Sequence, residues 1–355
     1  MRIGPLRPRL GAAGFRLTLP LIAHYYRQRS IFRSISRFAL KRFAALRAKL
    51  DRGETVYLAG IGAGTHNSGV ALVEVTRQAG PKVICNNEEE RFSGEKHSTQ
   101  FPQMAIDVLL RTMNGIGLGP ERIDAWLGAF DYPAMHATLI RTVLEEAPAS
   151  FAMLRRLPAT PTLYPLHLGQ TALTAQRLGQ QLGRGGPVPV IAIPHHDNHA
   201  WFSFAGSPMA RSTRPVVVAV LDGHGDLGAI SIYLCERRSM RRLRCNDSVF
   251  DSLGIFYSVV SSSQGGWTWL SSEGRYMGAT AFGNNNRQTN RFYTPMRQLF
   301  SLHPEGQVYL NRALANWQRD AFHAPYTPEL VRILGEPIAL EDMWNPDKVL
   351  HGPPE

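Results

Sequence analysis

The sequence predicts an α/β protein built from two similar lobes. Three observations support this fold class. First, the 355 residues are 44% hydrophobic, which is enough for a large core and excludes a disordered or collagen-like chain. Second, the predicted elements run in the order strand, strand, strand, helix, strand, helix, which is typical of a layered α/β domain. Third, this order restarts along the chain, and each round opens with two strands joined by a turn of glycine and small polar residues.

The first predicted lobe covers residues 55–187. Runs of apolar residues predict two strands at 56–61 and 70–75, joined by a tight glycine-rich turn at 62–69. Further segments have the periodicity of strands or helices. We expect strands at 82–87 and 123–130 and helices at 104–113, 134–147 and 168–182.

The second predicted lobe covers residues 188–355. A short apolar strand at 188–193 leads into a histidine-rich segment, and a second hairpin follows with a polar glycine turn at 222–226. This turn lies about 160 residues after the first, which indicates a degenerate internal duplication. Turns of this kind donate backbone N–H groups to anions, so we expect both turns to face a cleft between the lobes. The remaining expected elements are strands at 216–221, 227–235 and 242–250 and a helix at 251–262.

The net charge of +11 belongs to a basic N-terminal extension, residues 1–54. Residues 1–50 contain 12 Lys and Arg and no carboxylate, which leaves 27 basic and 28 acidic residues in the rest of the chain. A protein that follows nucleic-acid phosphates needs basic residues on its folded domain, so we expect no nucleic-acid partner.

Apolar residues at three- and four-residue steps from Phe32 to Leu50 predict an amphipathic helix in this extension. We interpret the extension as a poorly packed leader or a start site placed too far upstream, rather than as a membrane contact. The apolar stretch at 17–26 contains Pro20 and His24 and is too short to span a membrane. The three cysteines have no metal-type spacing and cannot all pair within one chain, so we expect a reducing compartment and a cytoplasmic protein.

The histidine-rich segment predicts a metal site. His195 and His199 lie four residues apart at the start of a predicted helix, which puts both imidazoles on one helical face. Asp222 ends the next apolar strand and supplies a third ligand. A His, His, Asp set with open coordination positions suits Fe²⁺, Zn²⁺ or Mn²⁺. His196 is an alternative to His195, because a three-residue spacing to His199 is also compatible with one ion.

Dense charge marks the loop after the third predicted strand, residues 86–97. One interpretation is a solvated turn. In the other, Arg91, Lys96 and His97 bind or polarise an anionic carbonyl or phosphate donor, while neighbouring glutamates orient them. His66 in the first glycine turn then lies opposite this loop and donates a proton or a hydrogen bond.

A weaker signal for phosphate binding comes from Gly274 and Gly278, whose spacing lets the start of a helix approach a phosphate chain. Other common signatures are missing. The sequence contains no Walker A motif, no dinucleotide-binding glycine pattern and no nucleophile elbow, so an acyl-serine hydrolase has no support.

Six segments together resemble, in order and spacing, the N-terminal part of the O-carbamoyltransferases of the NodU/CmcH type, a region similar to the universal tRNA-threonylcarbamoyl-transferase. The resemblance covers residues 55–285, and the ordered set is far more specific than any one motif. The six segments are residues 64–72, 88–97, 195–200, 221–226, 252–257 and 274–278.

This resemblance implies an actin/Hsp70/sugar-kinase-like fold and the transfer of a carbamoyl group to a hydroxyl of a sugar, antibiotic or Nod-factor-like acceptor. Members use carbamoyl phosphate and ATP with Mg²⁺, through a carbamoyl-adenylate. The implied roles are iron-type metal ligation by His195, His199 and Asp222, catalytic contact with the carbamoyl group and its phosphate by His66 and Lys96, and nucleotide-phosphate contact by Gly223, Gly225 and Asp226.

The chain departs from the family pattern after residue 285. Members carry a further metal-binding aspartate in a glycine-rich segment and then a YrdC-like domain that makes the carbamoyl-adenylate, and residues 286–355 resemble neither. We therefore expect an incomplete second lobe. The alternatives to an active transferase are a truncated, non-catalytic remnant or a split subunit that binds nucleotide or a partner, such as a separate YrdC-like chain.

Two further points stay open at this stage. A relative that acts in tRNA threonylcarbamoylation is a third interpretation, which the loop at 88–97 favours less than the O-carbamoyl branch. Trp267 and Trp269 are candidates for stacking on a sugar acceptor, although packing in the core is the more common role of tryptophan.

Overall fold

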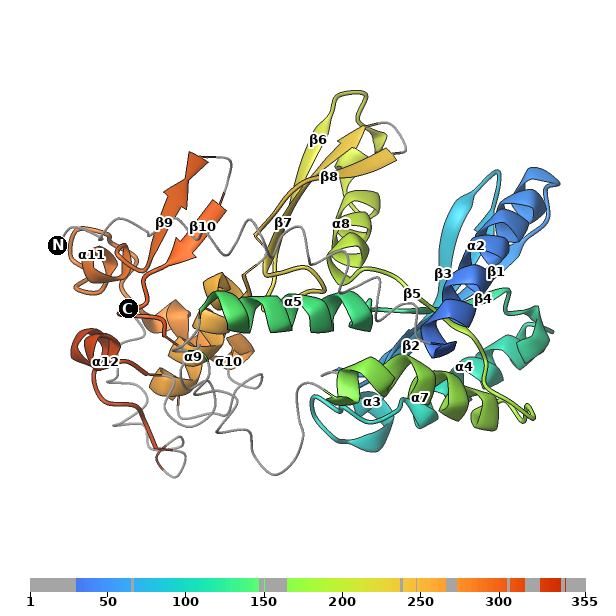
Figure 1. The fold of residues 1–355 in the computed structure, drawn as a ribbon, viewed down its shortest axis with the longest axis horizontal. Coiled ribbons are helices and arrows are strands. Elements are labelled where there is room, and N and C mark those ends of the chain that lie inside the picture. The colour runs from blue at the N-terminus through green and yellow to red at the C-terminus, as the bar shows by residue number, and fades with distance from the viewer. Residues whose placement is uncertain are drawn as a thin grey trace. The chain divides into compact units, whose positions relative to one another are not determined.

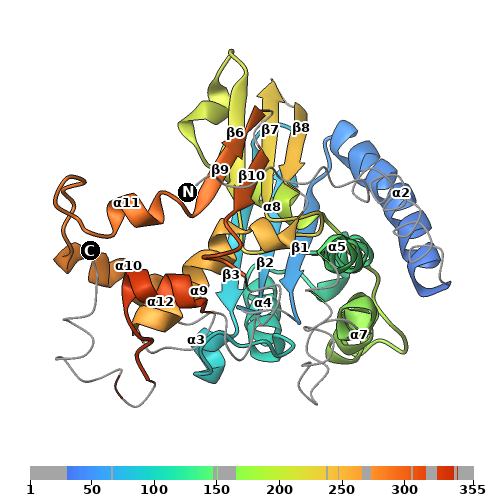
Figure 2. The same ribbon diagram turned by 60° about the vertical axis from the view of Figure 1, so that its left-hand side comes forward.

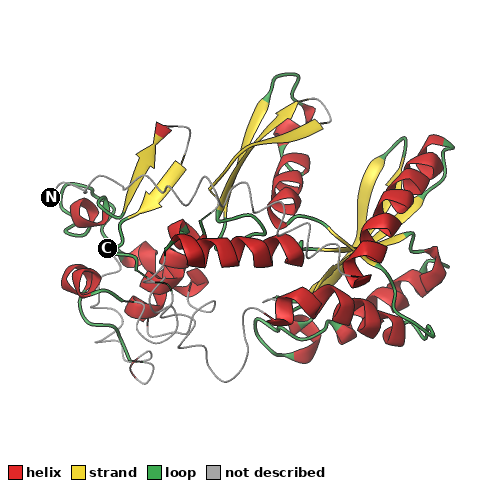
Figure 3. Cartoon of the chain, viewed as in Figure 1, coloured by secondary structure: helices red, strands yellow, loops and turns green. Residues whose placement is uncertain are grey.

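The computed structural model is a mixed α/β protein, which confirms the predicted fold class (Figures 1 and 3). Its chain divides into two compact units. The N-terminal unit contains described residues 30–137 and 165–198, and the C-terminal unit contains those of 138–150 and 199–342. The structure describes residues 30–64, 67–146, 150, 165–236, 239–246, 248–265, 273–304, 307–316, 326–339 and 342.

The N-terminal unit contains a five-stranded mixed sheet with the order β3-β2-β1-β4-β5. Strands β1, β2 and β3 form an antiparallel meander, whereas β1, β4 and β5 run parallel. The carboxyl ends of these three parallel strands therefore meet at one edge of the sheet, the usual place for ligand contacts in such sheets. The strands are β1 Val56–Gly62, β2 Gly69–Thr76, β3 Gly80–Glu88, β4 Ala125–Gly128 and β5 Val190–Ala192.

Helices α4 (Gln103–Gly115) and α7 (Pro165–Gln181) pack on one face of this sheet. Their apolar stripes meet Ala59 and Leu72 in a core from which water is excluded. The amphipathic periodicity of both predicted helices is thus confirmed, because burial of the stripe is what holds such helices in place. Two further helices begin in this unit, the short α3 (Glu90–Ser93) and α5 (Tyr132–Glu145), the second of which continues into the C-terminal unit.

The opposite face of the sheet is covered in part by α2 (Ser30–Asp51), the basic amphipathic helix predicted in the extension (Figure 2). Leu46 and Leu50 pack against Val56 of β1, together with Ala125 and Ile191. The sequence interpretation treats residues 1–54 as an extension separate from the lobe. For the end of α2 this is wrong, because its apolar residues belong to the core of the N-terminal unit.

Asp124 holds α2 to the sheet through charge as well. Its Oδ1 lies 2.8 Å from the Lys49 Nζ, and its main-chain oxygen accepts a hydrogen bond from Arg42. The other carboxylate oxygen accepts the main-chain N–H of Tyr57 at 3.0 Å. Part of the positive charge that the composition assigns to a leader is therefore paired within the fold.

Strand β5 differs from the sequence interpretation, which starts the second lobe at residue 188. It pairs in parallel with β4, in the register Trp126 to Val190, and so completes the first sheet. Periodicity identifies a strand but not its partner, which explains the difference. The predicted boundaries at 54 and 187 and the incomplete second lobe otherwise stay predictions.

The C-terminal unit contains a second antiparallel meander, β6-β7-β8. It repeats the β1-β2-β3 arrangement, so the predicted duplication of the hairpins is confirmed at the level of strand pairing. This repeat agrees with the actin/Hsp70/sugar-kinase-like fold implied by the sequence. The strands are β6 Val216–Leu221, β7 Ile230–Glu236 and β8 Ser239–Asn246, and a separate pair consists of β9 Phe300–His303 and β10 Gln307–Leu310.

Helix α9 (Leu253–Gly265) is the centre of the apolar core of this unit. Its Phe256 and Val259 pack with Leu310 of β10 and Leu330. The other helices are α8 His195–Ala205, which begins in the N-terminal unit, α10 Glu273–Ala279, α11 Tyr293–Met296 and α12 Pro328–Leu334. Among the described residues, no helix is long and apolar enough to cross a membrane.

A partly buried ion network fixes the start of α9 to the strand β10. Arg312 contacts the carboxylates of Asp251 and Glu146, each at 2.8 Å. Burial opposes the charge of the guanidinium, but the two carboxylates raise the pKa of Arg312 above its ordinary value. Asp251 is completely buried and also accepts the main-chain N–H of Leu310, so the network ties the helix start to the strand.

The packing of α2 gives a first test. Replacing Leu46 by alanine should lower the free energy of unfolding by about 2 kcal/mol, because the side chain is 8% exposed and lies in the core. Phe43→Ala on the same helix is the control, since Phe43 is 43% exposed, and its effect should stay within about 0.5 kcal/mol. Denaturant unfolding followed by circular dichroism measures both variants, and equal effects would contradict the docking of α2.

Candidate functional site

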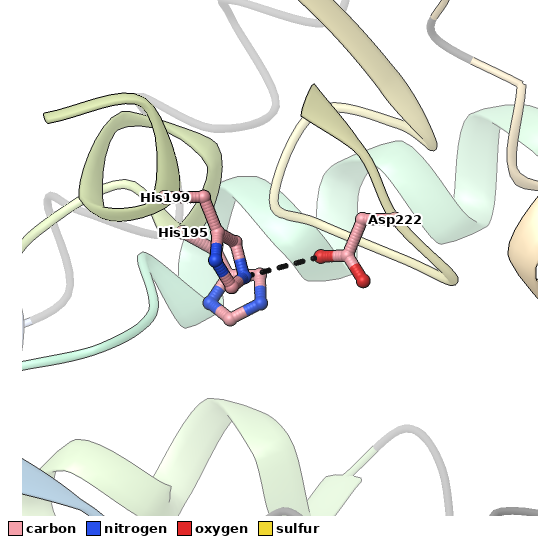
Figure 4. Close-up of side chains that lie close together, drawn as sticks. All are labelled: His195, His199 and Asp222. Carbon is pink, nitrogen blue, oxygen red and sulfur yellow. Dashed lines mark ion pairs between the residues drawn. The ribbon is translucent and has the colours of Figure 1, made fainter. Parts of the chain in front are cut away.

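Helix α8 and the end of β6 bring together His195, His199 and Asp222, the three residues proposed as metal ligands (Figure 4). One potential ligand atom from each lies within 4.8 Å of the other two. The Nε2 of His199 is 3.7 Å from the Oδ2 of Asp222. Both histidines are on one face of the continuous helix α8, as their four-residue spacing predicts.

A main-chain hydrogen bond orients the ring of His195. Its Nδ1 lies 3.1 Å from the main-chain oxygen of Ala129, and since a carbonyl oxygen only accepts, Nδ1 is the donor. The ring stacks on Phe130 with a centroid separation of 3.8 Å and an interplanar angle of 10°. This leaves Nε2 as the basic nitrogen in a fixed ring, the arrangement usually found around metal-binding histidines.

Asp222 is oriented by its own neighbour. The main-chain N–H of Gly223 donates to the Asp222 Oδ1 at 2.6 Å, while the Oδ2 faces His199. Because one oxygen is fixed to the backbone, the direction of the other is fixed as well.

His196, the alternative ligand, is placed differently. Its side chain is buried at 3% exposure, and its ring centroid lies 6.3 Å from that of His195. Among the described residues the group close enough to share one ion contains His195 and not His196, so the geometry favours the four-residue spacing.

The first glycine turn and the charged loop lie side by side in the N-terminal unit. The Nδ1 of His97 is 3.4 Å from the Oδ1 of Asn67, and the main-chain N–H of Ser68 donates to the oxygen of Ser98 at 2.9 Å. Asn67 and His97 both have left-handed backbone angles, φ 59° and 54°, which are uncommon outside glycine and concentrate at functional sites. His66, predicted to act from this turn, lies outside the described residues, as do Trp267 and Trp269.

Glu90 organises the charged loop. Its carboxylate accepts the main-chain N–H of His97 at 3.0 Å and lies 3.9 Å from the Lys96 Nζ and 4.0 Å from Arg91. The hydrogen bond from His97, assisted by the nearby positive charges, holds the pKa of Glu90 below its ordinary value. The Lys96 and Arg91 side chains remain largely exposed, so their positive ends are accessible to an anion.

The second glycine turn, residues 222–226, is closed by a hydrogen bond from the Gly225 N–H to the Gly228 oxygen at 2.7 Å. The side chain of Thr138 donates to the main-chain oxygen of Asp226 at 2.7 Å and anchors its far end. Gly223, Gly225 and Asp226 therefore share one ordered turn directly after the metal-ligand candidate Asp222. That this turn and the first glycine turn face one cleft stays a prediction.

Gly274 and Gly278 lie on another element, the exposed helix α10. Added Cβ atoms at both positions would meet no atom of the described residues, so no close approach among them requires glycine there. Tyr276 of α10 packs edge-on against Tyr257 of α9, and its burial raises its pKa to about 12. The tyrosine packing explains how α10 is held, and phosphate binding by its glycines stays a prediction.

Sequence reasoning missed the groups behind the ligands. Ala129 and Phe130 are the last two residues of the predicted strand at 123–130, but no spacing links them to His195, which is more than 60 residues away. Their position at the carboxyl end of a buried strand is the one signal that could have found them.

Residues 58–326 match the family described as carbamoyltransferase N-terminus. The chain belongs to this family. The resemblance found from the six sequence segments is thereby confirmed at family level, while the NodU/CmcH subtype stays a prediction. The match extends to residue 326, so the predicted end of the family pattern at residue 285 is wrong. The match includes all the candidate site residues of both glycine turns, the charged loop and the His, His, Asp group.

One curated relative of this carbamoyltransferase-family chain is the uncharacterized protein sll1178 of Synechocystis sp. (strain ATCC 27184 / PCC 6803 / Kazusa). The two are 25% identical over 265 residues, which cover 74% of this chain and 40% of the relative. The chain therefore spans about two-fifths of the length of that relative.

Solved structures of the Ppx/GppA family from Aquifex aeolicus are also similar. Two of them share 11% and 13% sequence identity with this chain, with TM-scores of 0.32 and 0.29. Each comparison covers 64% of this chain, and 62% and 64% of the respective structures. The two-lobe interpretation rests on the repeated sheets rather than on these low scores.

The role of Glu90 can be tested through pH. Glu90→Gln should speed amide exchange at His97 at neutral pH, because a neutral amide accepts that N–H more weakly than a carboxylate. The pKa of Glu90 is lower in the folded protein than in the unfolded chain, where it is about 4.3. Its carboxylate therefore stabilises the folded protein at pH values above the unfolded pKa, and this stabilisation is lost as the pH falls through the folded pKa. At low pH, amide exchange at His97 in the wild type should therefore approach the rate found in Glu90→Gln.

Glu88→Gln is the control for this measurement, since Glu88 pairs with Arg91 and accepts no N–H from His97. The amide exchange rate at His97 is measured in the wild type and both variants and is corrected for the intrinsic pH dependence of exchange. Equal exchange at His97 in the wild type and Glu90→Gln at neutral pH would contradict the role of Glu90.

Proposed function

We propose that this chain carries the acceptor site of an O-carbamoyltransferase of the NodU/CmcH type, in the cytoplasm. The reaction moves a carbamoyl group, supplied by carbamoyl phosphate and ATP through a carbamoyl-adenylate, onto a hydroxyl of a sugar or secondary-metabolite acceptor. The observation that carries the proposal is the convergence of His195, His199 and Asp222 in a member of the carbamoyltransferase family.

The three side chains fit a divalent metal of the Fe²⁺, Zn²⁺ or Mn²⁺ kind. The donor set has two imidazoles and one carboxylate, and three protein ligands leave positions for substrates. The hydrogen bonds to Ala129 and from Gly223 fix His195 and Asp222 before any ion binds, which lowers the cost of assembling the site. Such an ion, when bound, polarises a carbonyl oxygen or acidifies a hydroxyl group.

The chain's own residues account for the other needs of the transfer. A new bond forms between the acceptor oxygen and the carbamoyl carbon, the bond from that carbon to the adenylate phosphate oxygen breaks, and the hydroxyl proton passes to a base. The turn at 222–226 is proposed to line the phosphate of the leaving AMP. Lys96 and Arg91 supply positive charge for the anionic donor, His97 is proposed to contact it as well, and His66 is proposed to donate a hydrogen bond to the carbamoyl group.

The metal site gives a direct test. The wild type is expected to retain close to one equivalent of Fe²⁺, Zn²⁺ or Mn²⁺ after purification and desalting, and a His195→Ala, His199→Ala double variant should lose it. His303→Ala is the control, because His303 is on β9 and contacts Ser301 and Tyr309 rather than the candidate ligands. Elemental analysis by mass spectrometry measures the content, and the same metal content in the double variant would refute the ligand assignment.

A second candidate function is a subunit or remnant that binds nucleotide or a partner without turnover. Its basis is the sequence, because residues 286–355 resemble neither the metal-binding segment nor the YrdC-like domain of the family.

An activity assay separates the two candidates. The chain is incubated with carbamoyl phosphate, ATP, Mg²⁺ and hydroxylated acceptors, with and without a separate YrdC-like protein, and AMP and the carbamoylated product are measured. We expect product only in the presence of the second protein. Product in either mixture would overturn the remnant interpretation, and product in neither mixture, with metal bound, would favour it.

A further inference from the structure

The start of α9 packs directly against the turn that follows β6. A Cβ atom added at Gly254 would lie 2.7 Å from the main-chain nitrogen of Gly223 and 2.9 Å from the carbonyl carbon of Asp222. These distances are shorter than any real Cβ contact, and both neighbours are backbone atoms that cannot rotate away. Gly254 has an ordinary helical position, so the close approach itself is what requires glycine there.

The main-chain nitrogen that Gly254 faces belongs to the peptide group that orients Asp222. It is the Gly223 N–H that donates to the Asp222 Oδ1 at 2.6 Å and thereby directs the Oδ2 toward His199. Any side chain at position 254 would push this peptide group away and turn the carboxylate with it.

Ser252 makes a second contact with the same peptide unit. Its hydroxyl donates to the main-chain oxygen of Asp222 at 3.1 Å and accepts the N–H of Ile255 at 2.9 Å. The residue is completely buried, and its side chain caps the start of α9. The start of α9 therefore touches Asp222 on its main-chain oxygen through Ser252 and on its carbonyl carbon through Gly254.

We infer that Gly254, together with Ser252, is a positioning residue for Asp222: the helix start sets the backbone of the turn and, through the Gly223 N–H, the direction of the carboxylate. This inference rests on the proposed function for its metal readout. A residue that only packed α9 against the sheet would change stability when mutated but would leave the coordination of a bound ion as it was.

The test compares Gly254→Ala with Gly115→Ala in the full chain. Gly115 is also a helical glycine, at the end of α4, and an added Cβ there would meet open space. Co²⁺ serves as the probe, since its visible spectrum reports coordination geometry. We expect Gly254→Ala to bind Co²⁺ at least tenfold more weakly and with an altered spectrum, and Gly115→Ala to match the wild type in both.

Ser252→Ala keeps the space and the glycine and removes only the hydroxyl. It should weaken Co²⁺ binding in the same direction as Gly254→Ala, by a factor of about three or more. If Gly254→Ala fails to fold, Co²⁺ binding by Ser252→Ala tests the positioning role instead. Unchanged Co²⁺ affinity and spectrum in every folded variant would overturn the inference.

Amide exchange separates failure of this inference from failure of the proposed function. The N–H groups of Asp222 and Gly225 bond to Ala229 and Gly228 at 2.9 and 2.7 Å, and both should exchange faster in Gly254→Ala than in Gly115→Ala. If the wild type binds no Co²⁺, the metal proposal fails while this exchange difference still supports the positioning role. If the wild type binds Co²⁺ and neither exchange nor binding changes, the positioning role fails alone.

Discussion

The candidate site depends on the hydrogen bond that the Gly223 N–H donates to the carboxylate of Asp222. A carboxylate at the end of a strand rotates freely unless something binds one of its oxygens. Here the adjacent peptide group does so, and the start of α9 holds that peptide in place through Ser252. His195 is held in a comparable way, by the oxygen of Ala129 and the ring of Phe130. Two of the three candidate ligands, His195 and Asp222, are thus oriented by backbone groups.

The repeated hairpin explains why such groups occur where they do. In each unit an antiparallel meander leaves a short glycine-containing turn at a strand end, and the next segments pack against it. In the N-terminal unit the turn contacts the loop of His97 and Ser98, and in the C-terminal unit it contacts the start of α9. The same backbone arrangement therefore holds different side chains in the two units.

For the basic helix α2, amino-acid composition and side-chain packing give different information. Twelve basic residues without a carboxylate mark residues 1–50 as distinct from the rest of the chain. Yet Leu46 lies in the core and Lys49 pairs with Asp124, so the end of this segment stabilises the sheet. Charge content describes a segment along the chain, whereas the acidic partner of Lys49 lies 75 positions away and is brought near only by folding.

The sequence by itself determined the α/β class, the duplicated hairpins, the carbamoyltransferase resemblance and the His, His, Asp set, because periodicity and spacing are local properties. Only the tertiary structure decided that β5 belongs to the first sheet, that His195 rather than His196 joins His199 and Asp222, and that Gly254 lies against Gly223. The physical reason is that strand partners, ring stacking and backbone approach are contacts between distant segments. Neither the periodicity of one segment nor the spacing within it specifies which distant atoms it will meet.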